Sequence, residues 1–204
     1  MKKTLLILTA MLFVGFTAPA FSAETVSTMT MTADEKLQAE KIIMELHNYN
    51  NEKMKEGYGP FVAAIYDKNG NLVAKTANTV VKDKCPLHHA EMNCIKAACE
   101  KLGTYDLSNK GLKMYVTAEP CVMCAGGIMW SGIDTVYYSV NSKDVQKLTG
   151  FDEGYKPLLW KAQFKKRGIN LYGGIEESAG KASLDKYVLD GHTVYKPERQ
   201  DNND

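Results

Sequence analysis

The chain has 204 residues, of which 45% are hydrophobic and 24% are charged, and its formal net charge at pH 7 is +1. This length is enough for one domain with a substantial core. A near-neutral chain lacks the broad positive field that drives binding to nucleic acids, which leaves only a local basic patch for that purpose.

Residues 1–23 have the layout of a secretory signal peptide. Two lysines give a positive start, the apolar run 5–16 follows, and small residues come next. This run is shorter than the roughly 20 residues that a spanning helix needs, so we expect no stable membrane anchor. Cleavage after Ala20 or Ala23 would remove both lysines. The mature chain would then keep 23 basic and 24 acidic residues, a net charge of −1. The sequence thus predicts an exported protein, periplasmic or secreted.

The rest of the chain shows helix and strand patterns in alternation. Thr32 to Glu35 fits a capping box at the start of a helix, and Asn69-Gly70 between two apolar runs is typical of a β-hairpin. Such alternation favours one α/β domain around a mixed sheet. We expect a flexible segment 24–31, a domain 32–196 and a polar tail 197–204. The expected elements are helix 32–57, strands 61–66 and 72–76, loop 82–86, helix 88–101, strand 113–118, a short helix opened by Pro120, strand 134–140, a loop to about Tyr155, helix 158–167, strand 169–172 and helix 183–189.

Two short motifs carry candidate metal ligands. They are His89-Ala90-Glu91 and Pro120-Cys121-Val122-Met123-Cys124, each expected at the start of a helix. Zinc takes imidazole nitrogen and thiolate sulfur in tetrahedral geometry, and cysteines one helical turn apart can face one ion. His89, Cys121 and Cys124 would therefore hold zinc and leave a fourth position for water. Glu91 faces away from His89 on a helix, which leaves its carboxyl free to move a proton between water and substrate.

The remaining cysteines leave an alternative open. Cys85 or His88 could supply a fourth ligand and close the site as a structural zinc centre, although such a site has no need of Glu91. Cys94 and Cys99 are interpreted as buried, small apolar side chains. Because the chain has five cysteines, at least one stays outside any internal pair.

The combination His-x-Glu and Pro-Cys-x-x-Cys resembles the signature of zinc-dependent base deaminases. With the stretch 117–126, the chain resembles the cytidine and deoxycytidylate deaminase superfamily over roughly residues 33–190. The resemblance implies a three-layer α/β/α sandwich with a mixed five-stranded sheet. It also implies zinc (Zn²⁺) at the N-termini of two helices, and a homodimer.

Within this superfamily the chain is most similar to guanine deaminases. The similar stretches are Gly59-Pro60-Phe61, residues 95–107, Trp130 and Gly150-Phe151-Asp152-Glu153. The resemblance implies that Phe61 and Asn78 hold a purine and that Trp130 lines the pocket. It implies that an acid helps to move protons, for which we take Asp152 as catalytic and Glu153 as a substrate contact. In this branch the C-terminal segment also helps to close a pocket.

The tRNA adenosine deaminases are a second similar branch, since residues 121–126 suit them equally well. The signal peptide and the mature charge favour a small base or nucleoside over a nucleic acid. The basic run 165–167 is interpreted as a solvated helix C-terminus. The sequence therefore predicts zinc-dependent deamination of a nucleobase or nucleoside, guanine-like first. A nucleic-acid deaminase and a zinc-binding structural or interaction module are the alternatives.

Overall fold

The structure of the chain, a computed structural model, describes residues 30–196. The predicted signal peptide 1–23, most of segment 24–31 and the tail 197–204 lie outside the described residues, so those expectations stay predictions. In residues 30–196, none of the helices combines the length and the apolar character that crossing a membrane would require.

The described chain forms five strands and seven helices. They are α1 (Ala33–Lys55), β1 (Val62–Tyr66), β2 (Leu72–Ala77), α2 (Val80–Asp83), α3 (Ala90–Leu102), β3 (Lys113–Ala118), α4 (Val122–Ser131), β4 (Thr135–Val140), α5 (Ser142–Thr149), α6 (Trp160–Lys166), β5 (Asn170–Tyr172) and α7 (Glu177–Leu189).

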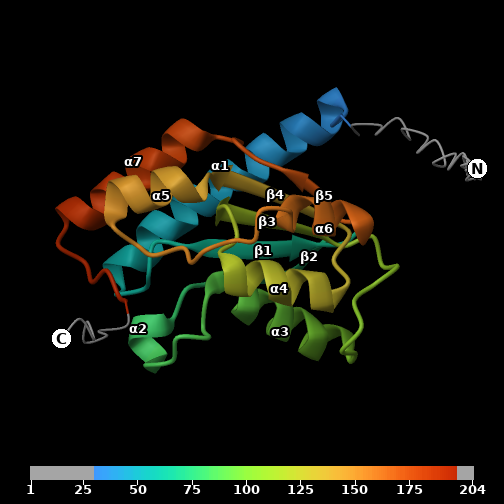
Figure 1. Cartoon of the computed structure of the whole chain (residues 1–204), viewed down its shortest axis with the longest axis horizontal. Coiled ribbons are helices and arrows are strands. Elements are labelled where there is room, and N and C mark those ends of the chain that lie inside the picture. The colour runs from blue at the N-terminus through green and yellow to red at the C-terminus, as the bar shows by residue number, and fades with distance from the viewer. Residues whose placement is uncertain (1–29, 197–204) are drawn as a thin grey trace, which may run out of the picture. The chain divides into compact units, whose positions relative to one another are not determined.

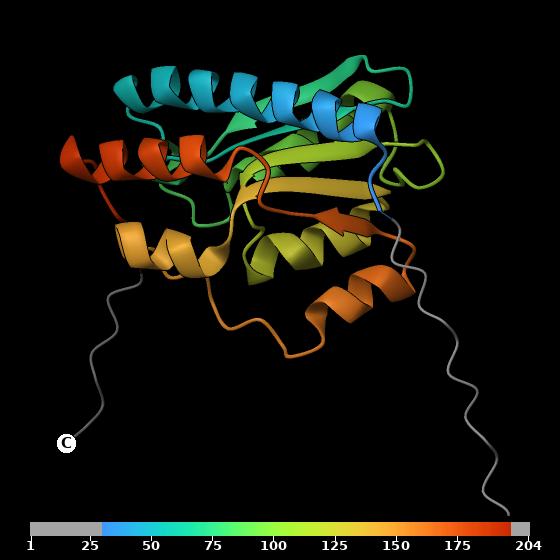
Figure 2. The same ribbon diagram turned by 90° about the horizontal axis from the view of Figure 1, so that it is seen from above.

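The strands make one mixed sheet with helices on both faces (Figures 1 and 2). The strand order is β2-β1-β3-β4-β5; β1 pairs antiparallel with β2 and β3, while β4 pairs parallel with β3 and β5. Helices α3 and α4 pack on one face and α1 and α7 on the other, with α5 against α7. The predicted three-layer α/β/α fold is confirmed.

The central strands are buried on both faces, which explains their continuous apolar character. In β3, Met114 and Val116 belong to the core under α3 and α4, whereas Tyr115 belongs to the core under α1. All six residues of β4 are buried. Tyr115 and Tyr137 stack with ring centroids 4.8 Å apart, so aromatic packing joins β3 and β4 on the α1 face.

Local start and turn signals act as predicted. The Thr32 Oγ1 accepts a hydrogen bond from the Glu35 amide at 3.2 Å, and Glu35 accepts one from the Thr32 amide at 3.1 Å, which completes the capping box. In the hairpin, the Asp67 carboxylate accepts bonds from two amides of the turn, and Gly70 takes a positive φ of 81°. A side chain is disfavoured at that angle, so glycine fits the turn.

Three helices differ from the sequence-based prediction. α2 lies partly in the expected loop 82–86, and α5 lies in the expected loop before Tyr155. Helix α5 has few apolar residues, but Asn141 caps it by accepting a bond from the Asp144 amide at 3.0 Å. α7 begins six residues before the predicted start, and Gly180 near its beginning lets it pack closely against the end of β4. A Cβ on Gly180 would lie 2.7 Å from Ser139 Oγ.

His47 is a buried polar residue in the contact between α1 and the sheet. Its side chain is 2% exposed, and its Nε2 lies 2.9 Å from Ser139 Oγ. Burial lowers the pKa of His47 to about 4, because the charged imidazolium is poorly solvated there. The folded protein therefore holds this imidazole neutral at neutral pH.

Acid is expected to destabilise the fold through His47. In the unfolded chain the imidazole has its ordinary pKa of about 6.5, so it takes up a proton before the folded form does. The contribution of neutral His47 to the free energy of unfolding is fully present above about pH 6.5. As the pH falls toward 4, the free energy of unfolding decreases by about 2–3 kcal/mol. Urea unfolding of metal-free protein at the two ends of this range measures the loss. Over this pH range the free energy of unfolding of His47→Gln should fall by about 2–3 kcal/mol less than that of the unsubstituted protein. Equal losses in the two proteins would contradict the prediction.

Candidate active site

The two predicted motifs meet at the N-termini of α3 and α4. His89 is the N-cap of α3 and Cys121 is the N-cap of α4, both with extended backbone. Pro120 thus precedes the N-cap instead of opening the helix itself. An N-cap residue lies at the mouth of its helix, where free amides and the helix dipole favour negative charge. Cys124 lies one turn into α4, close enough to share that environment.

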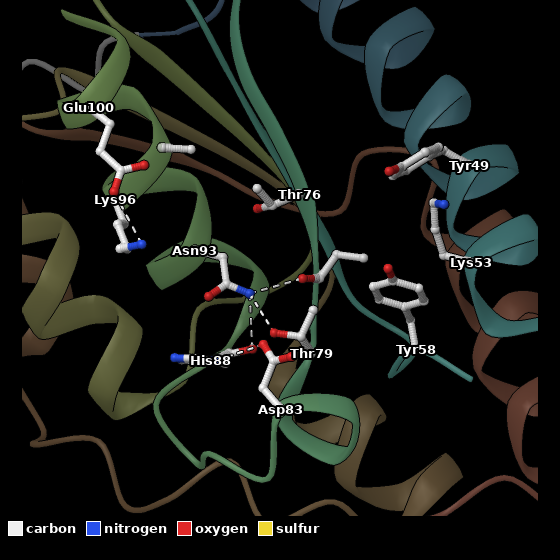
Figure 3. Close-up of a pocket in the computed structure, with 12 residues that line it drawn as sticks. Tyr49, Lys53, Tyr58, Thr76, Thr79, Asp83, His88, Asn93, Lys96 and Glu100 are labelled. Carbon is white, nitrogen blue, oxygen red and sulfur yellow. Dashed lines mark hydrogen bonds and ion pairs between the residues drawn. The ribbon is translucent and has the colours of Figure 1, made fainter. Parts of the chain in front are cut away.

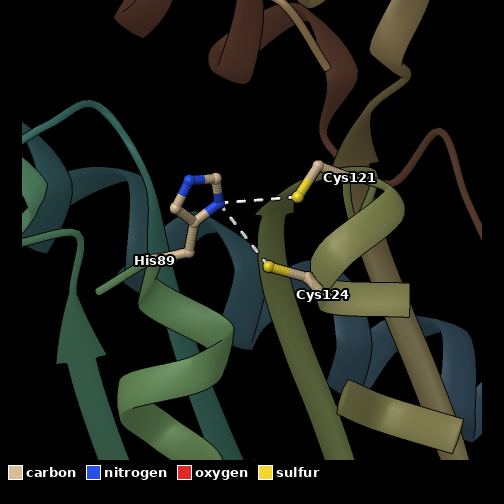
Figure 4. A group of neighbouring side chains, drawn as sticks. All are labelled: His89, Cys121 and Cys124. Atoms are coloured by element: carbon tan, nitrogen blue, oxygen red, sulfur yellow. Dashed lines mark hydrogen bonds between the residues drawn. The ribbon is translucent and has the colours of Figure 1, made fainter. Parts of the chain in front are cut away.

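The three candidate ligand atoms converge on one point (Figure 4). His89 Nδ1 lies 3.5 Å from Cys121 Sγ and 3.6 Å from Cys124 Sγ. Tetrahedral zinc with bonds of about 2.1 Å to nitrogen and 2.3 Å to sulfur would set those atoms roughly 3.6 Å apart. The spacing fits zinc without rearrangement, and the predicted zinc site is confirmed by this convergence together with the family match described below.

The alternative of a closed structural site has no further ligand in the described part of the chain. Among residues 30–196, the metal-ligand cluster consists of His89, Cys121 and Cys124 alone. The Nδ1 of His88 instead lies 2.8 Å from Asp83. Cys85 is half-buried and lines the cavity next to His89, but it lies outside the ligand cluster. Three ligands leave the open position that catalytic zinc sites keep.

Pairing within the ligand set shifts the pKa values of its three members in different directions. The hydrogen bond with Cys124, and then that with His89, lowers the pKa of Cys121 to about 4 against the opposing effect of burial. The same pairing with Cys121 raises the pKa of Cys124. Burial acts to lower the pKa of His89, but the bond to Cys121 and its charge outweigh it and raise that pKa. One sulfur is therefore a thiolate before metal binds, and zinc would displace the remaining protons.

Glu91 lies beside this ligand set in the first turn of α3 and is 6% exposed. Burial, followed by the nearby charge of Cys121, raises its pKa to about 7. A carboxyl with that pKa can both accept and give up a proton near neutral pH. The structure thus places Glu91 as the sequence predicts, next to the metal ligands but outside the ligand cluster.

A cavity of about 580 Å³ opens next to His89. Phe61 and Phe151 lie on its apolar side, with ring centroids 5.3 Å apart in an edge-to-face arrangement. Tyr195, near the end of the described chain, lies edge-on to Phe151 at 4.9 Å and to His89 at 6.1 Å. The aromatic walls suit a flat, unsaturated ring.

Asn78 is fully buried next to this cavity. Its Nδ2 donates to the Tyr195 hydroxyl at 2.7 Å, and its Oδ1 accepts from the Val80 amide at 3.1 Å. Gly59 makes room for this amide, because a Cβ there would lie 2.7 Å from Asn78 Oδ1. The sequence could not place Tyr195, since more than a hundred residues separate it from Asn78 and no local pattern marks it.

The two acids after Phe151 are placed differently. Both line the cavity, but Asp152 is exposed and its Oδ1 accepts from the Gly154 amide at 2.9 Å. Glu153 is half-buried, and burial followed by the charges of Cys121 and Glu91 raises its pKa to about 8. The environment of Glu153 suits proton transfer better than that of Asp152.

Trp130 does not line the cavity, contrary to the expectation from the resemblance. It is 88% exposed at the far end of α4. Six residues at 1.5 Å per residue carry it about 9 Å along the helix from Cys124, away from the zinc ligands. Within one chain, the sequence proximity of Trp130 to the motif does not bring it to the pocket.

A second cavity, of about 380 Å³, lies at the edge of β2 (Figure 3). Its polar groups largely pair with one another. Asn93 Nδ2 lies 3.2 Å from Ala77 O, 3.0 Å from Thr79 Oγ1 and 3.3 Å from His88 O. This amide therefore ties the end of β2 to the backbone directly before His89, which fixes the metal ligand. No pattern in the sequence predicts that role for Asn93.

Comparisons with known proteins agree with this geometry. The cytidine and deoxycytidylate deaminase zinc-binding region matches residues 36–140. A guanine deaminase of Bacillus subtilis is 37% identical over 97 residues, 48% of this chain and 60% of the relative. A tRNA-specific adenosine deaminase of Aquifex aeolicus is 43% identical over 82 residues, 40% of this chain and 53% of the relative. The chain thus spans between half and two thirds of the length of these relatives.

A solved structure is also similar. The guanine deaminase of Nitrosomonas europaea superposes with a TM-score of 0.67 at 33% identity, covering 78% of this chain and 86% of that one. The likeness extends well beyond the zinc motifs and includes the sheet and its helices.

Proposed function

Because the chain belongs to the cytidine and deoxycytidylate deaminase zinc-binding family, we propose that it is a zinc-dependent aminohydrolase acting on a purine base or nucleoside, guanine first. The observation that carries the proposal is a three-ligand zinc site with a buried carboxyl beside it. His89, Cys121 and Cys124 supply the ligands, and Glu91 supplies the carboxyl. The reaction would replace an amino group on a ring carbon by oxygen from water and release ammonia.

The chain's residues divide the work of that reaction. Zinc held there would supply an activated water at neutral pH. Glu91 takes a proton from water and delivers it to the ring nitrogen next to the amino-bearing carbon, as the water oxygen bonds to that carbon. Glu91 then takes the second proton from this oxygen and delivers it to the amino group, which leaves as ammonia when the carbon–nitrogen bond breaks. Its raised pKa suits both directions of transfer. The aromatic side chains of the cavity would orient the ring.

Substrate contacts follow from the cavity. Phe61 offers a ring face or edge to the base, and Asn78 offers an amide that can read a base edge once Tyr195 releases it. Glu153 would contact the leaving amine or the ring and help to move protons. In the prediction from sequence, Asp152 is the acid that helps to move protons. Glu153 suits that role better, since the Asp152 carboxylate accepts a hydrogen bond from the Gly154 amide. We propose no contact for Trp130 within its own chain.

Ammonia release by the zinc-loaded protein tests the proposal. The panel is guanine, guanosine, adenine, adenosine, cytosine and cytidine. We expect turnover of a purine, with guanine highest, because guanine deaminases are similar to this chain in both sequence and fold. Zinc binding without turnover of any compound in this panel, or of tRNA or single-stranded DNA, would favour a structural or interaction module.

A nucleic acid is the second candidate substrate, favoured by the similarity to the Aquifex aeolicus tRNA-specific adenosine deaminase. Turnover of tRNA or single-stranded DNA, with none of free bases, would establish it. The chain's net charge of +1 supplies little attraction for a polyanion, which is why a small substrate comes first.

A homodimer is proposed from exposed apolar side chains on α4 and on the segment between α5 and α6. Trp130 is 88% exposed and Leu158 is 91% exposed, and such side chains commonly mark interfaces when they gather on one surface. Trp130→Glu is expected to shift sedimentation from dimer toward monomer. Leu189→Glu, an 85% exposed position on α7, is the control and should leave the dimer intact. A monomeric unsubstituted protein would refute the proposal.

Export is proposed from the N-terminal sequence. Its support is the positive start, the apolar run 5–16 and the small residues before Ala20 and Ala23. Cell fractionation with N-terminal sequencing of the product would test it. A product that keeps its first residues in the cytoplasm would overturn the proposal.

A further inference from the structure

Glu119 connects β3 to the zinc motif and is held rigidly. Its side chain is 8% exposed, and its Oε2 accepts a bond from the Ser142 amide at 2.9 Å. Its own amide donates to Val140 O at 2.7 Å. This carboxylate lies two residues before Cys121, outside the ligand cluster, and the reaction described above does not use it.

Lys156 reaches the same carboxylate from the segment that follows α5. Its side chain is only 10% exposed, and its Nζ lies 3.7 Å from Glu119 Oε2 and 2.5 Å from Ser142 Oγ. The ring of Trp160 lies 4.7 Å from this Nζ. Buried charges need partners, so removing one member of this pair costs more than breaking an exposed pair, because the remaining charge loses its compensation.

Lys156 lies three residues after Glu153, and that stretch lies against the zinc helix. The Glu153 carbonyl accepts a bond from the Val122 amide at 3.3 Å. Gly154 has a positive φ of 70°, and a Cβ there would lie 2.7 Å from Val122 Cγ1. The segment therefore contacts the first residue of α4 so closely that only glycine fits.

These contacts join the segment 153–156 to the chain on both sides of Cys121: Lys156 contacts Glu119, and Glu153 contacts Val122. We propose that the Glu119–Lys156 pair is a clamp that positions Glu153 at the zinc site, with both members acting as positioning residues. The inference rests on the proposed deaminase function and on the part given there to Glu153. Burial lowers the pKa of Lys156, while Glu119 and then Glu153 oppose that effect, as expected for an ammonium close to both carboxylates.

The chain offers a matched control for the clamp. Lys161 Nζ lies 3.3 Å from Glu119 Oε1, so it contacts the same carboxylate. However, its side chain is 59% exposed and it belongs to α6, outside the segment that carries Glu153. Exposed ion pairs contribute little, so Lys161 should be dispensable for the position of Glu153.

The test compares Lys156→Met, Lys156→Arg and Lys161→Met in the zinc-loaded full chain. For Lys156→Met we expect full zinc content, faster hydrogen exchange across residues 151–156, and kcat for the best substrate lowered about 10–100-fold. Lys156→Arg should recover most of kcat, and Lys161→Met should match the unsubstituted protein in all three measurements. Unchanged exchange in Lys156→Met would overturn the clamp whatever the substrate proves to be.

A double variant separates positioning from general damage to the fold. If Lys156 acts through Glu153, then Lys156→Met in a Glu153→Gln background should lower kcat no further than Glu153→Gln alone. A full additional loss would refute the inference. The exchange measurement needs no substrate, so absence of any deamination would count against the proposed function alone and leave the clamp to be judged by exchange.

Discussion

Glu91→Gln is expected to lower kcat for deamination by about 10²–10⁴-fold while zinc content stays at that of the unsubstituted protein. The amide keeps the size of the carboxyl but can neither accept a proton from water nor give one to the ring. Glu91 lies outside the cluster of ligand atoms, so its loss removes no metal ligand. Glu91→Ala should likewise abolish ammonia release and keep zinc. Ammonia release with zinc measured on the same samples gives the result.

A control on the same helix makes the Glu91 experiment specific. Glu100 lies on α3, is exposed, and pairs with Lys96 at 3.1 Å. Glu100→Gln makes the same chemical change away from the site and should leave kcat within about two-fold, as exposed pairs have little effect. Turnover retained in Glu91→Ala would rule out the proposed proton transfer. Loss of zinc in Glu91→Gln would show that the carboxyl helps to hold the metal.

Cys124→Ala is expected to remove zinc and, with it, all measurable turnover. The substitution leaves two protein ligands where catalytic zinc sites use three, and zinc bound to the folded form contributes directly to stability. The melting temperature should therefore stop responding to added zinc. Metal analysis after dialysis against a weak chelator, and melting curves with and without zinc, measure both effects.

Cys94→Ala is the matched control for the metal site. Cys94 and Cys124 are both 0% exposed, so the two substitutions remove the same atoms from equally buried positions. Cys94 Sγ lies 3.5 Å from Ala74 O and is outside the ligand cluster. Cys94→Ala should lower the free energy of unfolding, because it leaves a small void in the core, yet the variant should keep one zinc per chain. Equal loss of zinc in both variants would mean that packing, and not ligation, controls the metal.

Local signals in the sequence determined the parts of this protein that depend on neighbouring residues. Three such features depend only on residues a few positions apart, and all three are present in the structure. They are the capping box at Thr32, the turn at Gly70 and the spacing of Cys121 and Cys124. The continuous apolar strands and the intervening helices were sufficient for the α/β class. The sequence-based prediction places a loop where α5 lies, because this short helix has few apolar residues, although Asn141 caps it locally.

Only the tertiary structure decided which distant residues share the site. Tyr195 reaches Asn78 because the chain after α7 returns across the cavity, and no pattern in the sequence encodes that path. Trp130 is adjacent to the motif in sequence, but the rise of α4 takes it away from the zinc ligands. Glu153 is half-buried and Asp152 is exposed in a segment where Gly154 lies tightly against Val122 of α4.

The zinc ligands and Glu91 are thus determined by the sequence, because metal coordination and proton transfer demand particular residue types at short, fixed spacings. The cavity around them, its closure by Tyr195 and the link from Glu119 to Lys156 depend on how the layers pack. Packing joins residues that are far apart in the chain, so these features become visible only in the folded protein.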